Sequence, residues 1–254
     1  MKHNYLDFPS QFKIFAHRGF IYSGNEIVRD ENTLGAFRAA IEAGADYLEL
    51  DVQSSSDGIA VVFHDELLDR VSGRVGPINK LTWTEIQGVA LNFGEHIPRF
   101  EDVLVKFPTV RINVDIKSAQ AISDLANSIQ RHGAQERVLL TSFNESRRRA
   151  GVLAAPGVAT SPSAWLMLRI RLSHLLGLRL GRLLKSVNVL QIPVSYGILR
   201  LDSPKFIESV KQHGVEVVYW TINDPSEARR LRRNGANGIV TDRTDVMVSQ
   251  LNLK

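Results

Sequence analysis

Two acidic residues stand in a stretch that is otherwise typical of a buried strand. In "YLELDVQ", residues 47–53, Glu49 and Asp51 alternate with apolar residues. Because alternate residues of a strand share a face, both carboxylates point to one side and the apolar residues to the other. An ionised group is costly to bury unless it is paired or bound to a cation. The pattern therefore predicts chemistry on one face of this strand and packing on the other.

A second strand repeats this arrangement. In "VRINVDIK", residues 110–117, Asn113, Asp115 and Lys117 share the face opposite to the apolar residues. Three carboxylates brought into one dry pocket repel one another unless a cation lies between them. Oxygen ligands in a chain without cysteine favour Mg²⁺, Ca²⁺ or Mn²⁺ over zinc. A structural network, in which Lys117 pairs with one of the acids, is the alternative interpretation.

Groups suited to proton transfer and phosphate binding end three other extended runs. "AHRG" contains His17 and Arg18, "IAVVFHD" contains His64, and "VYWTIN" contains Trp220. Histidine transfers protons near neutral pH, and arginine is suited to gripping a phosphate. The tryptophan either stacks on a ligand or belongs to the core. Each signal is weak alone, but together with the three acids they favour metal-assisted phosphoryl transfer with a separate acid and base.

The elements that must position these residues follow a strand–helix rhythm. An extra extended run, residues 59–65, follows the second strand after the turn signal "SSSDG". Eight units of a strand followed by a helix can be counted along the chain. This number predicts a (β/α)8 TIM barrel in one domain, residues 1–254, with a doubly wound open sheet as the alternative. Active sites of such barrels lie at the C-terminal ends of the strands, where the candidate residues stand. The expected strands are residues 13–19, 47–53, 110–117, 137–143, 157–162, 188–194, 216–223 and 238–242.

The composition is that of an ordinary globular protein. Of 254 residues, 44% are hydrophobic and 23% are charged, and none is cysteine. The absence of cysteine excludes a disulfide framework and a thiolate nucleophile, and it favours a reducing compartment such as the cytoplasm. The first residues lack the apolar core of a signal peptide, and no run of about 18 apolar residues appears. We therefore expect neither a leader nor a membrane span.

Charge is distributed unevenly. Between Ser146 and Leu201 there are arginines and lysines but no acidic residue, which predicts an anionic partner surface. Residues 164–185 follow helical spacing, with most leucines expected on one face. They form either an outer barrel helix or a peripheral contact with an anionic membrane, at the inner membrane face if the protein is cytoplasmic. Nucleic acid is not expected as a partner, because no base-stacking or helix-turn-helix pattern accompanies the charge. The expected leucine face comprises Leu168, Leu172, Leu175, Leu176, Leu180 and Leu183, with Arg171, Arg182 and Lys185 opposite.

Several motifs taken together resemble the glycerophosphodiester phosphodiesterase family. They occur in family order from about Phe15 to Asp245, which is nearly the whole chain, and the combination is highly specific. The resemblance implies a (β/α)8 barrel that uses a divalent cation to hydrolyse glycerophosphodiesters to glycerol 3-phosphate and an alcohol. The matching motifs are "AHRG", "ENTLGAFRAAIEAGADYLELDVQSSSDG", "VVFHD", "IPRFEDVL", "NVDIK", "TSFN", "VYWTIND" and "GANGIVTDRTD".

The resemblance also implies roles for individual residues. The metal ligands would be Glu49, Asp51 and Asp115, holding Mg²⁺ or Ca²⁺, with Mn²⁺ as a further option. His17 and His64 would be the catalytic acid–base pair, with His17 as the base, although the sequence leaves the reverse assignment open. The substrate-binding residues would be Arg18 and Lys117 on the phosphate, Glu31 on the glycerol or on Arg18, and Trp220 at the substrate's flank.

One position departs from the family pattern. The third ligand is often glutamate in an "E-x-K" pattern, whereas this chain has Asp115 before Lys117. Aspartate is one methylene shorter, so the metal would lie closer to this strand or be reached through water. Three functions stay open: a glycerophosphodiesterase, a lysophospholipase D-type enzyme acting at a membrane surface, and a non-catalytic phosphate-binding barrel. The intact set of histidines and acids argues against the third.

Overall fold

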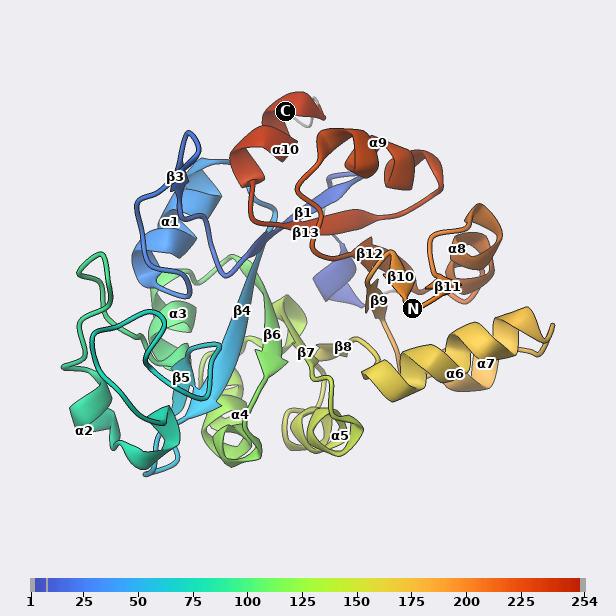
Figure 1. Cartoon of the computed structure of the whole chain (residues 1–254). Coiled ribbons are helices and arrows are strands. Elements are labelled where there is room, and N and C mark those ends of the chain that lie inside the picture. The colour runs from blue at the N-terminus through green and yellow to red at the C-terminus, as the bar shows by residue number, and fades with distance from the viewer. Residues whose placement is uncertain (1–2, 8, 252–254) are drawn as a thin grey trace.

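The computed structural model describes residues 3–7 and 9–251, and its centre is a sheet of eight parallel strands (Figure 1). Their order is β8-β7-β6-β4-β1-β13-β12-β9, so that the strands follow one another around the sheet in chain order. The (β/α)8 prediction is confirmed, and the doubly wound alternative is wrong. The strands are β1 (Lys13–His17), β4 (Tyr47–Ser54), β6 (Arg111–Ile116), β7 (Val138–Thr141), β8 (Ala159–Thr160), β9 (Val189–Ile192), β12 (Glu216–Tyr219) and β13 (Gly238–Thr241).

The barrel closes between β8 and β9 through a short bridge rather than a ladder. The Asn188 backbone N–H donates to the Thr160 carbonyl oxygen at 2.9 Å. In return, the Asn188 side-chain oxygen accepts from the Thr160 N–H at 2.9 Å. The Gln191 N–H donates to the Ser161 hydroxyl at 3.1 Å. Side chains thus satisfy backbone groups that an unpaired strand edge would leave open.

Helices cover the outside of the sheet, and several of them begin at side-chain caps. Thr33 accepts from the Ala36 N–H at the start of the first helix, and Asn144 and Ser163 cap two later helices in the same way. Such caps satisfy N–H groups that have no partner within the helix. The helices are α1 (Leu34–Glu42), α2 (Trp83–Ile86), α3 (Phe100–Lys106), α4 (Ile122–Arg131), α5 (Glu145–Ala154), α6 (Ala164–Leu175), α7 (Gly181–Leu184), α8 (Pro204–Lys211), α9 (Pro225–Arg233) and α10 (Thr244–Gln250).

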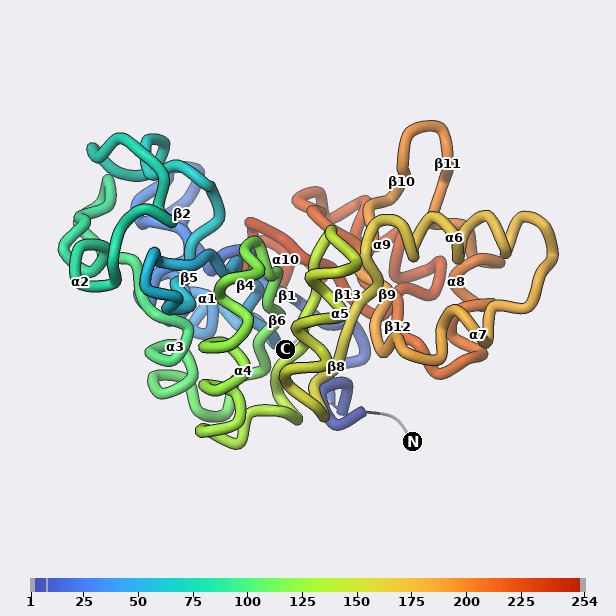
Figure 2. The backbone as a smooth tube through the Cα atoms, turned by 90° about the horizontal axis from the view of Figure 1, so that it is seen from below, coloured from blue at the N-terminus to red at the C-terminus, as the bar shows by residue number. Residues whose placement is uncertain are grey.

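Three excursions leave the barrel. The strand β5 (Ala60–Val62) pairs antiparallel with β4 and leads into a lobe that contains α2. The other two excursions are short antiparallel hairpins. One pairs β2 (Tyr22–Ser23) with β3 (Glu26–Ile27), and the other pairs β10 (Ser195–Tyr196) with β11 (Leu199–Arg200). Figure 2 shows the α2 lobe and the β10–β11 hairpin rising on the same side of the molecule, away from the N-terminal segment. Among the described residues, no helix has the length and hydropathy needed to span a bilayer.

The barrel interior is layered along each strand. An apolar layer fills its lower half and is closed from below by Tyr5 and Leu6 of the N-terminal 3-10 turn. Two residues further along the strands the same inward face becomes polar, as alternation requires. Phe15 is thus followed by His17, and Tyr47 by Glu49. The other apolar members are Leu139, Ala159, Val189, Val218 and Val240.

The basic segment 164–185 differs from its expected form. It divides into α6 and α7, and α6 extends outward from the barrel while α4 and α5 lie against it (Figure 1). The predicted leucine face is wrong within α6, although Leu180 after it is buried and Leu183 of α7 packs against the core. Leu172, Leu175 and Leu176 are exposed, whereas Arg171 is buried and donates to the Arg200 carbonyl oxygen at 2.8 Å. Helical spacing identifies neighbours on one face, but it does not say which face meets the barrel.

Candidate active site

A pocket of about 380 Å³ opens at the C-terminal ends of the strands. Eight of the nine predicted site residues line it, and they come from five different strands or the loops that follow them. Glu31 is the exception and lies behind Arg18, to whose guanidinium it is paired at 3.0 Å. The lining residues from the prediction are His17, Arg18, Glu49, Asp51, His64, Asp115, Lys117 and Trp220.

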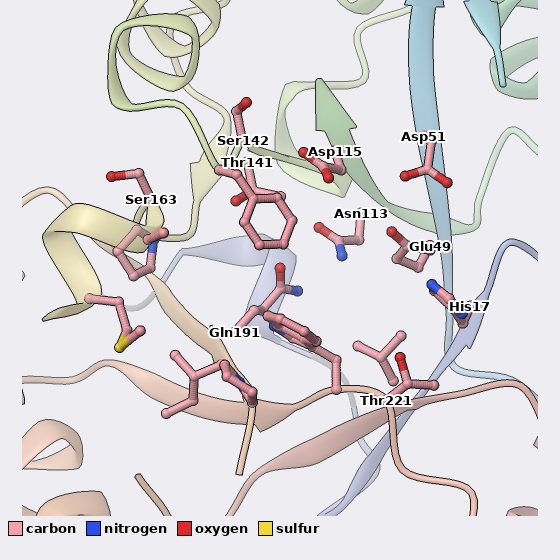
Figure 3. Close-up of a pocket in the computed structure, with 18 of the residues that line it drawn as sticks. His17, Glu49, Asp51, Asn113, Asp115, Thr141, Ser142, Ser163, Gln191 and Thr221 are labelled. Atoms are coloured by element: carbon pink, nitrogen blue, oxygen red, sulfur yellow. The ribbon is translucent and has the colours of Figure 1, made fainter. Parts of the chain in front are cut away.

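The carboxylates of β4 and β6 lie next to one another because the two strands pair in parallel. Asp51 stands opposite Asp115 in the register. The Lys117 ammonium lies 2.7 Å from an Asp115 oxygen and 3.1 Å from an Asp51 oxygen. The guanidinium of Arg18 approaches the other Asp51 oxygen at 3.1 Å. Figure 3 shows Glu49, Asp51 and Asp115 directed toward one shared space.

Arg18 adopts a strained backbone conformation at the end of β1. Its φ of 54° lies in the left-handed region, which is uncommon for a residue other than glycine. The bend directs the Arg18 N–H to a Glu49 carboxylate oxygen at 3.1 Å, and the Arg18 carbonyl accepts from the Asn32 N–H at 2.9 Å. Such strain persists only where the surroundings fix it, as at binding sites. Here it orients both the backbone and the guanidinium of one residue toward the acids.

The acids differ in protonation. Burial, together with the neighbouring charge of Asp51, raises the pKa of Glu49 to about 7. Burial also opposes the charged form of Asp51, but Lys117 and Arg18 outweigh it and hold the pKa of Asp51 below its ordinary value. Burial raises the pKa of Asp115. One more positive charge in this cluster would therefore stabilise the ionised form of Glu49.

The donor set fits a hard divalent cation. One oxygen of Asp115 and the side-chain oxygen of Asn113 are buried without a hydrogen-bond partner. Figure 3 shows Asn113 between Asp115 and Glu49. Oxygen atoms of this kind are the ligands that Mg²⁺ and Ca²⁺ prefer. In the part of the chain that the structure describes, no three His, Asp or Glu side chains converge closely enough to ligate one ion as placed. The Lys117 ammonium bridges Asp51 and Asp115 instead.

His17 is held by a carboxylate on its outer side. Its Nδ1 lies 2.6 Å from an Asp242 oxygen, and the other Asp242 oxygen accepts from the Asn223 side-chain amide at 2.7 Å. Burial opposes the protonated ring, but the Asp242 hydrogen bond and the charge of Glu49 raise the pKa of His17. An ionised carboxylate fixes the proton on Nδ1, which leaves Nε2 free to accept one.

His64 is held in the same way by its neighbour in the chain. Its Nδ1 lies 2.6 Å from an Asp65 oxygen, and the other Asp65 oxygen accepts from Arg70 Nε at 2.6 Å. Arg70 also donates to both oxygens of Glu31, at 2.5 and 3.1 Å. Since Glu31 is paired with Arg18, these residues form a chain of ion pairs that joins the α2 lobe to β1.

The opposite wall of the pocket is apolar. Trp220 packs edge to face against Phe143, with ring centroids 5.8 Å apart, and Met167 and Ile192 line the same pocket. The Lys117 ammonium lies 5.7 Å from the Phe143 ring centroid, at the boundary between the two walls. The pocket thus offers charges to one end of a ligand and apolar contact to the other.

The sequence analysis did not identify Asp65 and Asp242, the two carboxylates that contact Nδ1 of the histidines. Asp65 follows His64 directly in the chain, and Asp242 directly follows β13, two residues after the inward-facing Val240. Strand alternation at "GIVTD" was a sufficient signal for Asp242. Arg70 could not be found this way, because it stands in the irregular lobe, where no periodicity relates it to Glu31.

The pocket holds two imidazoles fixed at Nδ1, a carboxylate cluster and two cationic side chains. Together they can activate a nucleophile, protonate a leaving group and offset charge on a phosphate. Comparison with known proteins agrees with this chemistry. The sequence profile of the Glycerophosphoryl diester phosphodiesterase family matches residues 17–246. The Mycobacterium tuberculosis protein named "Probable glycerophosphodiester phosphodiesterase 2" is 34% identical over 235 residues, which are 91% of this chain and 88% of the relative.

Two further similar proteins carry names for different activities. The structure of an Oleispira antarctica phosphodiesterase in complex with the product sn-glycerol-3-phosphate superposes with a TM-score of 0.75, at 26% identity, and the match covers 94% of this chain and 96% of that one. The Mus musculus protein named "Lysophospholipase D GDPD3" is 26% identical, with 91% of this chain and 79% of the relative covered. The family profile spans almost the whole barrel, and so this chain belongs to the Glycerophosphoryl diester phosphodiesterase family.

Proposed function

We propose that this phosphodiesterase hydrolyses glycerophosphodiesters to glycerol 3-phosphate and an alcohol. The observation that carries the proposal is the pair of carboxylate-held histidines, His17 and His64, on one pocket with the acid cluster of β4 and β6. The Oleispira antarctica relative, whose bound product is sn-glycerol-3-phosphate, supports the choice of substrate class.

The residues have distinct roles in this proposal. His17 Nε2 accepts a proton from the attacking oxygen, which belongs either to water or to the neighbouring glycerol hydroxyl, and His64 protonates the oxygen of the departing alcohol. If the glycerol hydroxyl attacks, water then opens the cyclic phosphate to give glycerol 3-phosphate. Arg18 and Lys117 bind the phosphate oxygens and offset their charge. Glu31 orients Arg18 from behind, since Arg18 and Glu31 are already paired at 3.0 Å. Trp220 flanks the organic part of the substrate.

Glu49, Asp51 and Asp115 would hold one divalent cation, Mg²⁺, Ca²⁺ or Mn²⁺. The unpartnered Asp115 oxygen supports this assignment. Such a cation supplies a Lewis acid that lowers the pKa of the attacking oxygen and offsets phosphate charge. Its binding would also favour release of Lys117 from Asp51 and Asp115 toward the substrate, because the ammonium and the cation compete for the same oxygens.

Release of glycerol 3-phosphate from glycerophosphocholine tests the proposal. We expect activity that EDTA abolishes and that Mg²⁺ or Ca²⁺ restores, and a loss of about 10²–10⁴ in kcat for His17→Ala and His64→Ala. His213→Gln, at an exposed histidine after α8, is the matched control and should keep full activity. Activity that survives EDTA would contradict the cation, and near-normal turnover of His64→Ala would contradict its role.

A second candidate substrate is a lysophospholipid. The apolar wall formed by Phe143, Met167, Ile192 and Trp220 favours it, because a choline-bearing diester offers this wall little to contact. The mouse relative named as a lysophospholipase D supports the same reading. Choline release from lysophosphatidylcholine, compared with glycerol 3-phosphate release from glycerophosphocholine at equal concentration, decides between the two substrates. We further propose that segment 164–185 contacts an anionic membrane peripherally.

A further inference from the structure

An exposed apolar surface lies beside the pocket mouth. It comprises outward side chains of α6 and of the loop after it, together with the tip of the β10–β11 hairpin. Ile198 at this tip is 99% exposed, and Leu176 just after α6 is 72% exposed. Single exposed apolar residues are ordinary, but a concentration of them on one helix, its following loop and the neighbouring hairpin is not, and it marks a surface that binds something. The members of this apolar crest are Trp165, Leu172, Leu175, Leu176, Leu178, Tyr196 and Ile198.

These side chains are not a misplaced part of the core. α6 is already anchored by Leu166, Met167 and Ile170, which are buried. Trp165, Leu172 and Leu176 follow at spacings of seven and four residues, which places them in one row along the opposite side of the helix. The helix is thus apolar on the side that meets the barrel and again on the side that meets solvent. Burial in the fold explains the first row but not the second.

Cationic side chains accompany the crest. Arg169 lies in the same row as Trp165 and Leu172, four residues from the first and three from the second. Arg179, Arg182 and Lys185 follow in the loop and in α7, and all four cations are exposed. No acidic residue occurs from Ser146 to Leu201. Apolar side chains mixed with cations, without any acid, suit the surface of an anionic bilayer.

The crest and the pocket share an edge. Ala164 and Met167 of α6 and Tyr196 of the hairpin line the pocket, while their neighbours Trp165 and Ile198 belong to the crest. Figure 2 shows the hairpin rising beyond α6 on the side where the α2 lobe also rises. A flat surface laid on the crest would therefore lie beside the pocket mouth.

We propose that the apolar crest docks this protein on anionic lipid bilayers, with the pocket mouth beside the membrane surface. A second copy is a poorer occupant, because an isologous contact would place the same cations against one another. The proposal of docking is based on the exposed apolar side chains of the crest and on the cationic side chains beside it. Its use, to reach lipid-derived phosphodiesters where they are released, rests on the proposed function.

Cosedimentation with vesicles of phosphatidylglycerol, compared with vesicles of phosphatidylcholine, tests the docking without any activity measurement. We expect retention on the anionic vesicles that falls as salt is raised. Ile198→Ser and Leu176→Ser should each weaken retention about tenfold, through lost burial of an aliphatic side chain. Arg179→Gln and Arg182→Gln should each weaken it about fivefold, as expected for one cation near an anionic surface.

Matched controls stand elsewhere on the molecule. Leu153→Ser replaces a leucine that is 81% exposed on α5, and Arg233→Gln replaces an exposed arginine of α9; both should leave retention unchanged. None of these residues lines the pocket, so hydrolysis of glycerophosphocholine should also stay unchanged in every variant.

Three results would overturn the docking: no retention on anionic vesicles, retention that Ile198→Ser and Leu176→Ser leave intact, or a dimer in solution that these two substitutions dissociate. An inactive protein that still binds vesicles through the crest would instead contradict the proposed function alone.

Discussion

At the scale of residues, each pocket histidine keeps one ring nitrogen on a carboxylate. Asp242 holds Nδ1 of His17, and Asp65 holds Nδ1 of His64, both at 2.6 Å. The two carboxylates differ in their own partners, because an amide supports Asp242 while a guanidinium supports Asp65. Both rings are therefore held in place at Nδ1. The proposal assigns His17 as the group that takes a proton and His64 as the group that gives one.

A leaving group that needs no proton tests this assignment. On glycerophosphocholine, His17→Ala and His64→Ala should both lose about 10²–10⁴ in kcat. On the p-nitrophenyl diester of glycerol 3-phosphate, the departing phenolate is stable without a proton, so His64→Ala should recover most of this loss. His17→Ala should stay impaired on both substrates. Recovery of His17→Ala in place of His64→Ala would reverse the two roles.

Strand alternation identified the acids of the site. Glu49, Asp51 and Asp115 follow from alternation, because period two assigns a face to every residue of a strand. The ion pairs of Lys117 did not follow from the same rule. Alternation places its ammonium on the correct side, but its reach to Asp51 as well as Asp115 depends on the parallel register of β4 and β6. Register is a relation between strands that one strand's pattern does not contain.

At the scale of elements, the order of strands and helices was readable, but the orientation of α6 was not. Helical periodicity identified the segment, and in the structure Ser163 caps the start of α6. Leucines on both sides of α6 removed the contrast that normally tells the buried face from the exposed one. The burial of Arg171, against the Arg200 carbonyl oxygen, depends on a hairpin distant in sequence.

The turn after β1 depends on a glycine that two constraints fix at once. Gly19 has φ +88°, and a Cβ there would lie 2.7 Å from the Ala36 Cβ and 2.8 Å from the Ala36 carbonyl carbon. Gly58 has a similar φ of +84° but open space around it. Gly58→Ala should therefore cost about 1 kcal/mol from backbone strain alone, and Gly19→Ala distinctly more, about 2–4 kcal/mol.

Denaturant unfolding measures the free energy of unfolding of both variants. The difference between them gives the cost of the steric overlap with Ala36 beyond the backbone strain that both share. Gly19→Ala should also lower activity, since the turn orients Arg18 and Glu49. Equal destabilisation by the two substitutions would mean that the contact with α1 relaxes at no cost.

His174 near the end of α6 makes the stability of this element depend on pH. Burial lowers the pKa of His174, and the nearby Arg171 charge lowers it further, against a smaller opposing effect of the Lys205 backbone. Its Nδ1 accepts from Arg171 at 3.0 Å, which requires the neutral ring. The folded state thus binds fewer protons than the unfolded state, and stability is complete above the ordinary histidine pKa of about 6.5 and decreases below it.

Free energies of unfolding at about pH 7.5 and pH 5.5 measure this effect. The wild-type protein should lose more stability on acidification than His174→Gln does, because the substitution removes the group that titrates. His213→Gln, at an exposed histidine, should keep the wild-type pH dependence. If His174→Gln keeps that dependence as well, the ring is not the source.

At the scale of the whole molecule, the two ends of the barrel carry different tasks. The C-terminal ends of the strands gather strained backbone, raised and lowered pKa values and unpartnered oxygens. Toward the other end lies a closed apolar layer with Tyr5 and Leu6 beneath it. Such a division lets one end keep a costly arrangement of charges because the other supplies stability.

A buried ion pair at the lower end offers a test of this division. Lys13 and Glu216 open β1 and β12, and their charged atoms lie 2.7 Å apart with side chains only 4% and 9% exposed. Lys13→Met removes one cationic partner of a buried carboxylate, so it should lower the free energy of unfolding, by at most about 3–5 kcal/mol. Lys13→Met with Glu216→Leu removes both charges and should recover part of that loss, because Glu216 has a further interaction that the second substitution also removes.

Because His17 stands four residues beyond Lys13 in β1, about 13 Å lies between the two positions. Substitutions that far apart act nearly independently. We therefore expect kcat and KM of the folded variants to match the wild-type protein, measured well below their unfolding midpoints. A fall in kcat that the double substitution also shows would mean that the lower layer positions the site, and that stability and catalysis are not separated along the barrel axis.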